Sequence, residues 1–400
     1  VPLLPLFSRA LLEMGTTKRS YVDLGLQVAG QTGGMDAYPT FMTSQPGRKP
    51  VSHFMVSGKA NLDRVDGLAD LFREIILDTE FDNLDRFRQL LFEERARQEQ
   101  HLVPSGHSVV ISRLSAVRSV AGGLSELAGG ISNMDIVRDW ADNLDEHWPD
   151  LLADLNLIRE LLMRQSNLVI NITQEERYTS KVKQAIESVV EALPERELPE
   201  ESWTVNMPPL DEALLIPAGV NYVGKGANLY DLGYEFHGSI NVILKHLRTA
   251  WLWDKVRVQG GAYGAFSSFD RISGAFSFVS YRDPNVERTL KIYDDTAEYL
   301  QNLKLTPSEL ERSIIGAIGD LDVYQLPSAK GAASFYRHLI GDTREIRQKM
   351  RDEVLGTSVN DFRALGDVLA KVATSGNICL LGGAGVEEFA KAKGLLIRRA

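Results

Sequence analysis

The sequence predicts an α+β fold in which two homologous domains each combine a mainly antiparallel sheet with helices packed on one of its faces. Three observations support this prediction: the same order of elements occurs twice, strands precede runs of helices, and a proline-rich stretch separates the two copies. Strands and helices that do not alternate along the chain favour an antiparallel sheet. We therefore expect residues 1–200 and residues 201–400 to form the two domains.

Length and composition are those of an ordinary globular protein. The chain has 400 residues, of which 44% are hydrophobic and 24% are charged, and at about 150 residues per domain this length corresponds to two or three domains. Its formal net charge of −10 argues against nucleic-acid binding as the main function. No apolar run approaches the roughly 18 residues that a membrane span needs. We therefore expect neither a nucleic acid nor a membrane as a partner.

A linker is expected near residue 200, where the acidic stretch 193–201 is followed by Pro208 and Pro209. Similar short segments follow one another in the same order on its two sides. The matching pairs are Asn61–Arg64 with Asn285–Arg288, Leu84–Arg86 with Leu310–Arg312, Val103–Ser105 with Leu326–Ser328, and Asn167–Ile170 with Asn377–Leu380. Their shared order predicts an internal duplication, and the alternative is a pair of unrelated α+β domains.

The second copy carries the clearest signals for individual elements. Ala275–Tyr281 alternates and is rich in aromatic residues, which predicts a strand. Asp283 and Pro284 then provide an N-cap and a first-turn proline for a helix. Apolar residues three and four apart predict the buried face of that helix: Val286, Leu290, Tyr293, Ala297 and Leu300. Thr306–Glu309 is a capping box that opens a further helix through about Leu321.

The first copy shows the same succession of a strand and a helix. His53–Ser57 predicts the strand, and the helix that follows has its own apolar face: Leu62, Val65, Ala69, Phe72 and Ile76. We interpret these faces as core. Near the C-terminus, Gly382–Gly385 follows a strand but lacks the Gly-Lys-Ser/Thr ending of a phosphate-binding loop, so it predicts a plain strand-to-helix turn. A nucleotide-binding function would rest on these glycines alone.

The histidines do not form a zinc-binding pattern. Metallopeptidase helices place two histidines four residues apart so that both imidazoles reach one ion. No two of the seven histidines have this spacing: His53, His101, His107, His147, His237, His246 and His338. Asn143–His147 has the inverted zinc pattern with asparagine in place of the first histidine, and we interpret it as a coincidence. We expect no metal ligand in this chain.

Residues 254–265 form the candidate functional segment. Gly260 and Gly261 remove side chains where another backbone can approach closely. Arg257 offers a planar fork of donors, and Tyr263 offers a hydroxyl donor on a rigid ring. Such donors can stabilise an oxyanion that forms on a scissile carbonyl. Composition alone favours a hairpin followed by a strand here, with a functional site as the second interpretation.

The pattern Arg257-x-x-Gly260-Gly261-Ala262-Tyr263-Gly264 resembles the C-terminal-half signature of the pitrilysin/insulinase metallopeptidases, in their presequence-protease (falcilysin-like) subfamily. Leu4–Leu11 and Gly15–Gly34 resemble the start of the third of four homologous domains in that family, and Gln325–Arg337 fits the fourth. The resemblance covers most of the chain. It implies a LuxS/pitrilysin-like metalloprotease fold.

The resemblance also implies a function that this chain performs only with a partner. In the family, two bowl-shaped halves close around unfolded peptides, and the N-terminal half carries the zinc ion and its glutamate base. By residue match, Tyr263 would donate to the developing oxyanion, while Arg257 would bind substrate backbone or place the tyrosine. Gly260, Gly261 and Ala262 would then contact the substrate. Because every zinc ligand and the long helical hairpin between the halves are missing from the sequence, we expect this chain alone to be inactive.

An alternative within the same fold is a noncatalytic subunit with a binding or assembly role, like the core subunits of respiratory complexes. The presence of both Arg257 and Tyr263 favours the peptidase. The chain opens at Val1 without a signal-like succession of charged and apolar regions. We therefore expect a processed chain or a fragment, located in a bacterial cytoplasm or an organelle matrix. The single cysteine, Cys379, fits a reducing compartment.

Overall fold

In the described residues, the first region of the chain (residues 1–197) contains helices and one β-hairpin, and the second region (residues 207–400) contains the larger sheet. The computed structural model describes residues 1–45, 47–166, 168–197, 205 and 207–400. In the hairpin, β1 (Met35–Thr43) pairs antiparallel with β2 (Pro50–Gly58). The helices of this region are α1 (Leu4–Glu13), α2 (Tyr21–Gln31), α3 (Val65–Asp78), α4 (Leu84–His101), α5 (Gly106–Ala116), α6 (Val120–Gly129), α7 (Ile131–Asp142), α8 (Leu144–Leu162) and α9 (Thr179–Ala192). The predicted strand of the first copy is confirmed as β2, and the predicted helix is present as α3. The predicted face is only partly right, because Leu62 lies in a short 3-10 turn before α3 and neither Leu62 nor Val65 joins the buried core.

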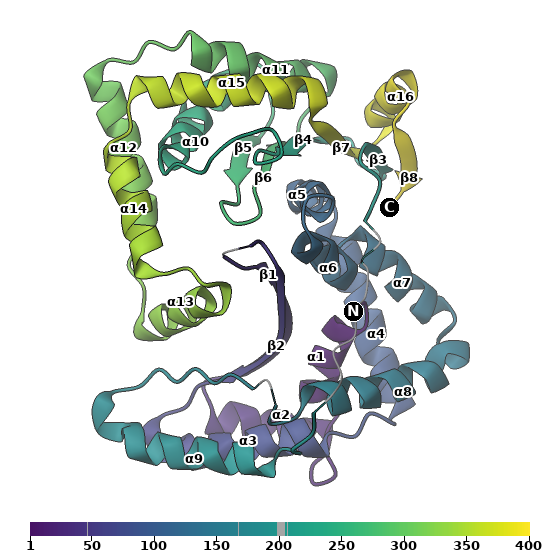
Figure 1. Cartoon of the computed structure of the whole chain (residues 1–400). Helices are drawn as coiled ribbons and strands as arrows, with labels where there is room; N and C mark the ends of the chain where they lie inside the picture. Colours follow the sequence, from purple (N-terminus) through teal and green to yellow (C-terminus); the bar gives the residue numbers. More distant parts are fainter. Residues whose placement is uncertain (46, 167, 198–204, 206) are drawn as a thin grey trace.

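The second region is built on a six-stranded sheet with the strand order β5–β6–β4–β7–β3–β8 (Figure 1). Its strands are β3 (Glu212–Leu215), β4 (Tyr222–Asn228), β5 (Gly264–Phe269), β6 (Ala275–Tyr281), β7 (Asn377–Gly382) and β8 (Leu396–Arg399). Strands β5, β6, β4 and β7 pair antiparallel, whereas β3 runs parallel to both of its neighbours. The expectation of a mainly antiparallel sheet is confirmed, and β6 has the bounds that the sequence predicted.

The helices of the second region are α10 (Ser239–Thr249), α11 (Glu287–Gln301), α12 (Pro307–Leu321), α13 (Pro327–Ile340), α14 (Arg344–Leu355), α15 (Val359–Ser375) and α16 (Ala384–Lys393). Of these, α10, α11, α15 and α16 cover one face of the sheet. Helices α11 and α15 pack side by side above the sheet (Figure 1). Their apolar residues join alternate strand residues such as Val223 and Phe278 in one core. The plain turn predicted at Gly382–Gly385 is confirmed as the link between β7 and α16.

The predicted apolar face of α11 is confirmed, because all five of its residues are buried in this core. The predicted start of that helix is wrong. Asp283 is not the N-cap, and α11 begins four residues later, at Glu287. The Asp283 carboxylate is buried and accepts hydrogen bonds from the Asn285 amide and the Thr289 hydroxyl, at 2.8 and 2.7 Å. Asp283 therefore organises the turn before α11. The predicted capping box at Thr306, which opens α12, is confirmed.

The opposite face of the sheet is covered by a helix of the first region. Side chains along a strand alternate between the two faces of the sheet. Tyr222 is next to Val223 and Val279 is next to Phe278, so Tyr222 and Val279 point into a second core on the opposite face. Val110 and Leu114 of α5 fill that core. Helix α5 lies against β4, β6 and β7 (Figure 1). One of the two faces of the second region's sheet is therefore covered by a helix of the first region.

A buried ion network joins the two regions at this contact. Arg113 of α5, Glu126 of α6 and Glu212 of β3 have side chains only 1–2% exposed. The Arg113 guanidinium donates to both carboxylates, through Nη2 to Glu212 at 2.7 Å and through Nη1 to Glu126 at 3.1 Å. The other oxygen of Glu126 accepts from the Ser112 hydroxyl at 2.7 Å. Each carboxylate in the network is thus paired with the guanidinium and hydrogen-bonded, which lowers the cost of burying its charge.

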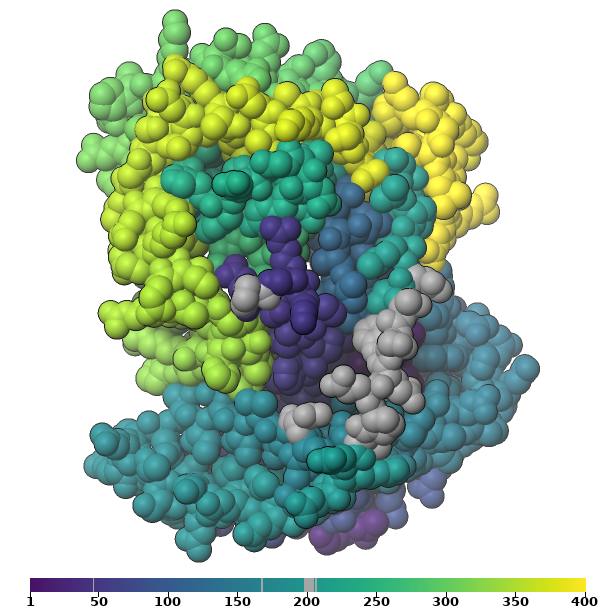
Figure 2. Space-filling view, viewed as in Figure 1, coloured from purple at the N-terminus to yellow at the C-terminus, as the bar shows by residue number. Residues whose placement is uncertain are grey.

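The hairpin forms a second bridge between the regions. Near its tip, the amide of Gln45 donates to the Ile340 carbonyl at 2.7 Å, and the hydroxyls of Tyr38 and Tyr336 lie 2.8 Å apart. The Arg48 guanidinium stacks over the Tyr230 ring at 3.8 Å. In the space-filling view, this purple hairpin is wedged between the yellow-green helices and the blue ones (Figure 2).

Two sequence expectations concern residues near the predicted linker. Most of the stretch from 198 to 206 lies outside the described residues, so the linker is not described. The segment matched to β7 through the internal repeat begins at Asn167, which also lies outside them. Its described part, 168–170, forms no strand, and these three apolar residues are 42–44% exposed. A strand requires a neighbour to pair its backbone, and no strand pairs with this segment in the described residues.

No helix in the described part of the chain combines the length and the apolar character that a bilayer crossing requires.

We predict that Arg113→Met destabilises the chain by about 3–5 kcal/mol, because it leaves two buried carboxylates without their cation. Urea unfolding, followed by circular dichroism, measures this loss. The matched control is Arg95→Met, which removes a partly exposed pair with Asp142 and should cost less than about 1 kcal/mol. Equal losses in the two variants would contradict the role assigned to the buried network.

Candidate functional site

The candidate segment begins with a helical turn. Trp253–Val258 forms a π-helical turn, η3, instead of the first arm of the expected hairpin, so that expectation is wrong. The strand that was expected after it is present as β5. Leu252 and Val256, four residues apart, are completely buried in the core, while Trp253 and Arg257 share the outer side. A spacing of four is the helical one, and this signal was available in the sequence.

A tight turn follows, and its glycines are required for packing within the chain. A Cβ atom on Gly260 would lie 2.4 Å from the Val256 carbonyl oxygen. Gly261 has φ +80°, which L side chains rarely adopt. The amides of Gly261 and Ala262 donate back to the carbonyls of η3, at 2.9 and 3.1 Å. The glycines thus close the turn under the helix, a role that differs from the close approach of a second backbone expected from the sequence.

Tyr263 stands at the end of this turn with its ring in solvent. It is 68% exposed. Its amide donates to the Tyr281 carbonyl at 3.0 Å and, more weakly, to the Arg282 carbonyl at 3.3 Å. Its ring meets the Tyr281 ring edge-on, with centroids 5.6 Å apart. Within the described residues the Tyr263 hydroxyl has no hydrogen-bond partner. The backbone of Tyr263 is therefore hydrogen-bonded, while its hydroxyl is available to donate to a ligand.

Arg257 projects from η3, on the other side of the same turn. Its guanidinium lies 3.8 Å above the centre of the Trp253 ring, a cation–π contact that fixes the plane of the fork. None of the described carboxylates forms an ion pair with it. No hydrogen bond joins Arg257 to Tyr263 in the described part of the chain. The turn therefore connects the two predicted residues along the chain, with Arg257 against Trp253 and Tyr263 against Tyr281.

The three residues predicted to contact substrate have different surroundings. Gly261 is exposed, and Gly260 is partly exposed with its carbonyl accepting from the Asn285 side chain at 2.6 Å. The Ala262 side chain is only 4% exposed and faces the core. The amides of Gly261 and Ala262 are engaged within the turn, whereas the surface of Gly261 is exposed to a ligand. Asn285 was missed by sequence reasoning, although it follows the short Asp283–Pro284 turn.

No metal site was found in the described ranges. No three side chains of His, Cys, Asp or Glu gather there closely enough to hold an ion. The near-match Asn143–His147 forms the start of α8, where His147 Nε2 lies 3.1 Å from a carboxylate oxygen of Asp139. The imidazole thus faces an acid on the preceding helix instead of a second imidazole.

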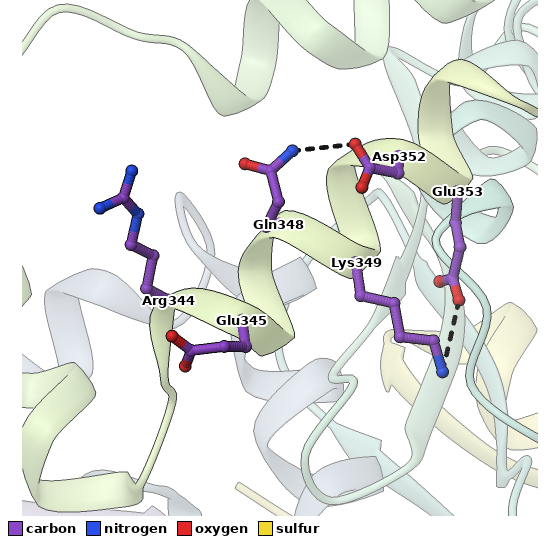
Figure 3. A pocket seen from close by; sticks show the side chains of 6 residues that line it. All are labelled: Arg344, Glu345, Gln348, Lys349, Asp352 and Glu353. Atoms are coloured by element: carbon purple, nitrogen blue, oxygen red, sulfur yellow. Dashed lines mark hydrogen bonds and ion pairs between the residues drawn. The ribbon is translucent and has the colours of Figure 1, made fainter.

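Two hollows lie away from the candidate segment. A groove of about 710 Å³ follows α14, where side chains four apart pair with one another (Figure 3). Gln348 donates to Asp352 at 2.8 Å, and Lys349 lies 3.7 Å from Glu353. A smaller hollow of about 310 Å³ lies between the hairpin, α5–α6 and the β5–β6 turn. Neither Arg257 nor Tyr263 lines either hollow.

Comparisons with known proteins place most of the chain in two families of domains. Residues 211–382 match the family model of the PreP C-terminal domain, and residues 1–139 match the model of a region associated with peptidases of family M16, group C. The chain is 40% identical over 379 residues to presequence protease 1, chloroplastic/mitochondrial, of Arabidopsis thaliana, with 94% of this chain covered. It is 23% identical over 382 residues to the mitochondrial presequence protease of Saccharomyces cerevisiae, with 92% covered.

The chain spans 35% and 38% of the lengths of these two curated relatives. A solved structure of a peptidase M16 inactive domain from Pseudomonas fluorescens is similar in fold, with a TM-score of 0.61 at 16% identity. That likeness covers 95% of this chain and 87% of the other. It concerns the fold alone.

We predict that Gly260→Ala destabilises the chain by about 1–3 kcal/mol, because its Cβ collides with backbone and the turn must shift. Thermal unfolding followed by circular dichroism measures the effect. Gly219→Ala is the control, since nothing lies within 4 Å of a Cβ placed there, and it should stay within about 0.5 kcal/mol. A Gly260 variant as stable as the control would disprove the packing role of this glycine.

Proposed function

Because the chain belongs to the presequence-protease family of M16 peptidases, we propose that it is the zinc-free C-terminal half of a zinc-dependent oligopeptidase that degrades unfolded peptides in a closed chamber. The observation that carries this proposal is the turn at residues 257–263. It carries Arg257 where η3 ends and Tyr263 where β5 begins, and the Tyr263 amide is hydrogen-bonded to carbonyls at the end of β6 and just after it. In the described residues neither the Arg257 guanidinium nor the Tyr263 hydroxyl has a hydrogen-bond or ion-pair partner.

Zinc and the general base belong, in this proposal, to the missing N-terminal half. The described residues do not fit a zinc ion, because they contain no cluster of suitable ligands. When bound to the other half, zinc supplies an activated water for attack on the peptide carbonyl. The contribution of this chain is confined to binding the peptide and stabilising charge.

Tyr263 acts as the donor to the carbonyl oxygen that becomes negative during the attack. Its amide is fixed by the carbonyls of Tyr281 and Arg282, so the hydroxyl swings only about the side-chain bonds. A donor held in place before the reaction costs little reorganisation when charge develops, which is why such donors are effective. Closure of the two halves would exclude water and strengthen this interaction.

Arg257 binds the peptide beside this position. Stacking on Trp253 orients the guanidinium plane, and its donors suit carbonyl oxygens of an extended chain. The carbonyls and the open surface of the turn at Gly260, Gly261 and Ala262 provide further backbone contacts. The proposed substrate is accordingly an unfolded peptide, which is recognised mainly by contacts to its backbone.

The division into domains at residues 1–200 and 201–400 is retained as part of this proposal. The zinc-bearing half is supplied either by the same polypeptide or as a separate subunit. A bacterial cytoplasm or an organelle matrix is the compartment proposed for the assembled enzyme, since relatives of this chain are described as mitochondrial or chloroplastic.

We expect the purified chain, supplied with zinc, to leave unfolded peptides uncut. A mixture with its zinc-bearing half should cleave the same peptides, and a chelator should stop this cleavage. Mass spectrometry of the peptides measures both results. Chelator-sensitive cleavage by the chain alone would overturn the division of labour, whereas an inactive mixture of folded, associated halves would favour a noncatalytic binding subunit.

We expect Tyr263→Phe to lower kcat of the assembled enzyme by roughly 10²–10³-fold, with KM nearly unchanged, because one preorganised donor is removed from the transition state. Steady-state kinetics on a quenched fluorescent peptide measures the loss. Tyr324→Phe removes a hydroxyl from a residue that is 81% exposed on another loop, and it should leave both constants unchanged. Normal turnover by the Tyr263 variant would remove the proposed role.

A further inference from the structure

The first turn of α5 lies behind the strand end that holds Tyr263. His107, from this turn, meets the Tyr281 ring edge-on, with centroids 4.9 Å apart. It also lies 5.9 Å from the Phe266 ring. Tyr281 in turn contacts Tyr263 through its ring and accepts the Tyr263 amide hydrogen at its carbonyl. Three aromatic rings therefore connect a helix of the first region to the candidate oxyanion donor in the second.

The close approach of α5 is built into the sequence at Gly106. A Cβ atom there would lie 2.5 Å from the Tyr222 ring, so only glycine lets the helix start this close to the sheet. The Tyr222 hydroxyl donates to the Val103 carbonyl just before the helix, and its ring lies 5.8 Å from that of Tyr281. Tyr222 thereby fixes where the next residue of the helix, His107, meets Tyr281.

The polar atoms of His107 do not explain its position. Its Nδ1 is buried and has no partner among the described residues, and its Nε2 is a long 3.5 Å from the Ser108 hydroxyl. Burial lowers the pKa of His107, which favours the neutral ring. It faces Tyr281 and Phe266 on the sheet and Ser108 on its own helix, and the Tyr281 ring also carries the Arg282 guanidinium. The contacts that remain are those of a neutral aromatic ring.

We propose that His107 is a positioning residue for Tyr263, which it holds in place by fixing the ring of Tyr281. The expected effect of His107 on catalysis rests on the proposed role of Tyr263. Its expected effect on the position of the Tyr263 ring does not. If the His107 ring is removed, Tyr281 loses the support on one side and tilts into the vacated space. Tyr263, attached to Tyr281 by ring and backbone, then moves with it. A displacement of about 1 Å can cost up to roughly 10²-fold in rate.

The test of geometry uses the 400-residue chain alone. A 3-fluorotyrosine placed at position 263 reports the surroundings of that ring by fluorine NMR. We expect His107→Ala to shift or broaden this resonance and His107→Phe, which keeps a ring, to restore it. Ser108→Ala, on the exposed neighbour, and a fluorotyrosine at position 324 serve as controls and should show no change. If His107→Ala does not fold, His107→Gln, which keeps volume without a ring, is expected to show the same shift.

The test of function uses the chain assembled with its zinc-bearing half. We expect His107→Ala to lower kcat about tenfold with KM within about twofold, and His107→Phe to recover most of the loss. An unchanged resonance at position 263, or a Phe variant as impaired as the Ala variant, would overturn the positioning role. A resonance that moves while Tyr263→Phe retains full turnover would leave the positioning role intact and remove the proposed function of Tyr263.

Discussion

The structure depends most on the buried pairing of Arg113 with Glu212 and Glu126. One guanidinium serves two carboxylates, and all three side chains are withdrawn from water. Separately, each charge would be too costly to bury, but together they hold α5 and α6 of the first region against β3 of the second. This requirement for a partner makes the contact between the regions specific, whereas apolar surfaces alone would allow several arrangements.

That contact determines how the sheet is covered. With α5 on one face and α10, α11 and α15 on the other, β6 is enclosed on both sides, and its side chains enter two separate cores. The edge strand β5 and the turn before it are therefore anchored to a firm support. Tyr263 is exposed at its tip but fixed at its backbone. An exposed side chain on a hydrogen-bonded backbone suits the donor role proposed for Tyr263.

The arrangement also connects the first region with the candidate site in the second. His107 and Gly106 lie on the same helix as Arg113, which the ion network anchors to β3. The network and the aromatic contacts thus act on two ends of one short helix. The hairpin adds a separate connection, from Gln45 to Ile340 and from Arg48 to Tyr230.

Local features were readable in the sequence because their causes are local. The strand at Ala275–Tyr281, the buried face of α11 and the capping box at Thr306 depend on residues a few positions apart. The start of α11 was misplaced because Asp283 can cap a helix or a turn, and only its burial against Thr289 decides which. The helical turn before Gly260 was missed because its glycines outweighed the four-residue spacing of Leu252 and Val256.

By itself, the sequence determined the α+β class, the alternation and periodicity of its elements, and the residues Arg257 and Tyr263 at one turn. Only the tertiary structure decided that α5 covers the second sheet and that His107 reaches Tyr281. Arg113 and Glu212 are 99 residues apart in the chain, and no spacing rule links such positions. Such contacts depend on the burial of charged groups and on the packing of a helix face against a sheet face. Both arise only when the chain has folded.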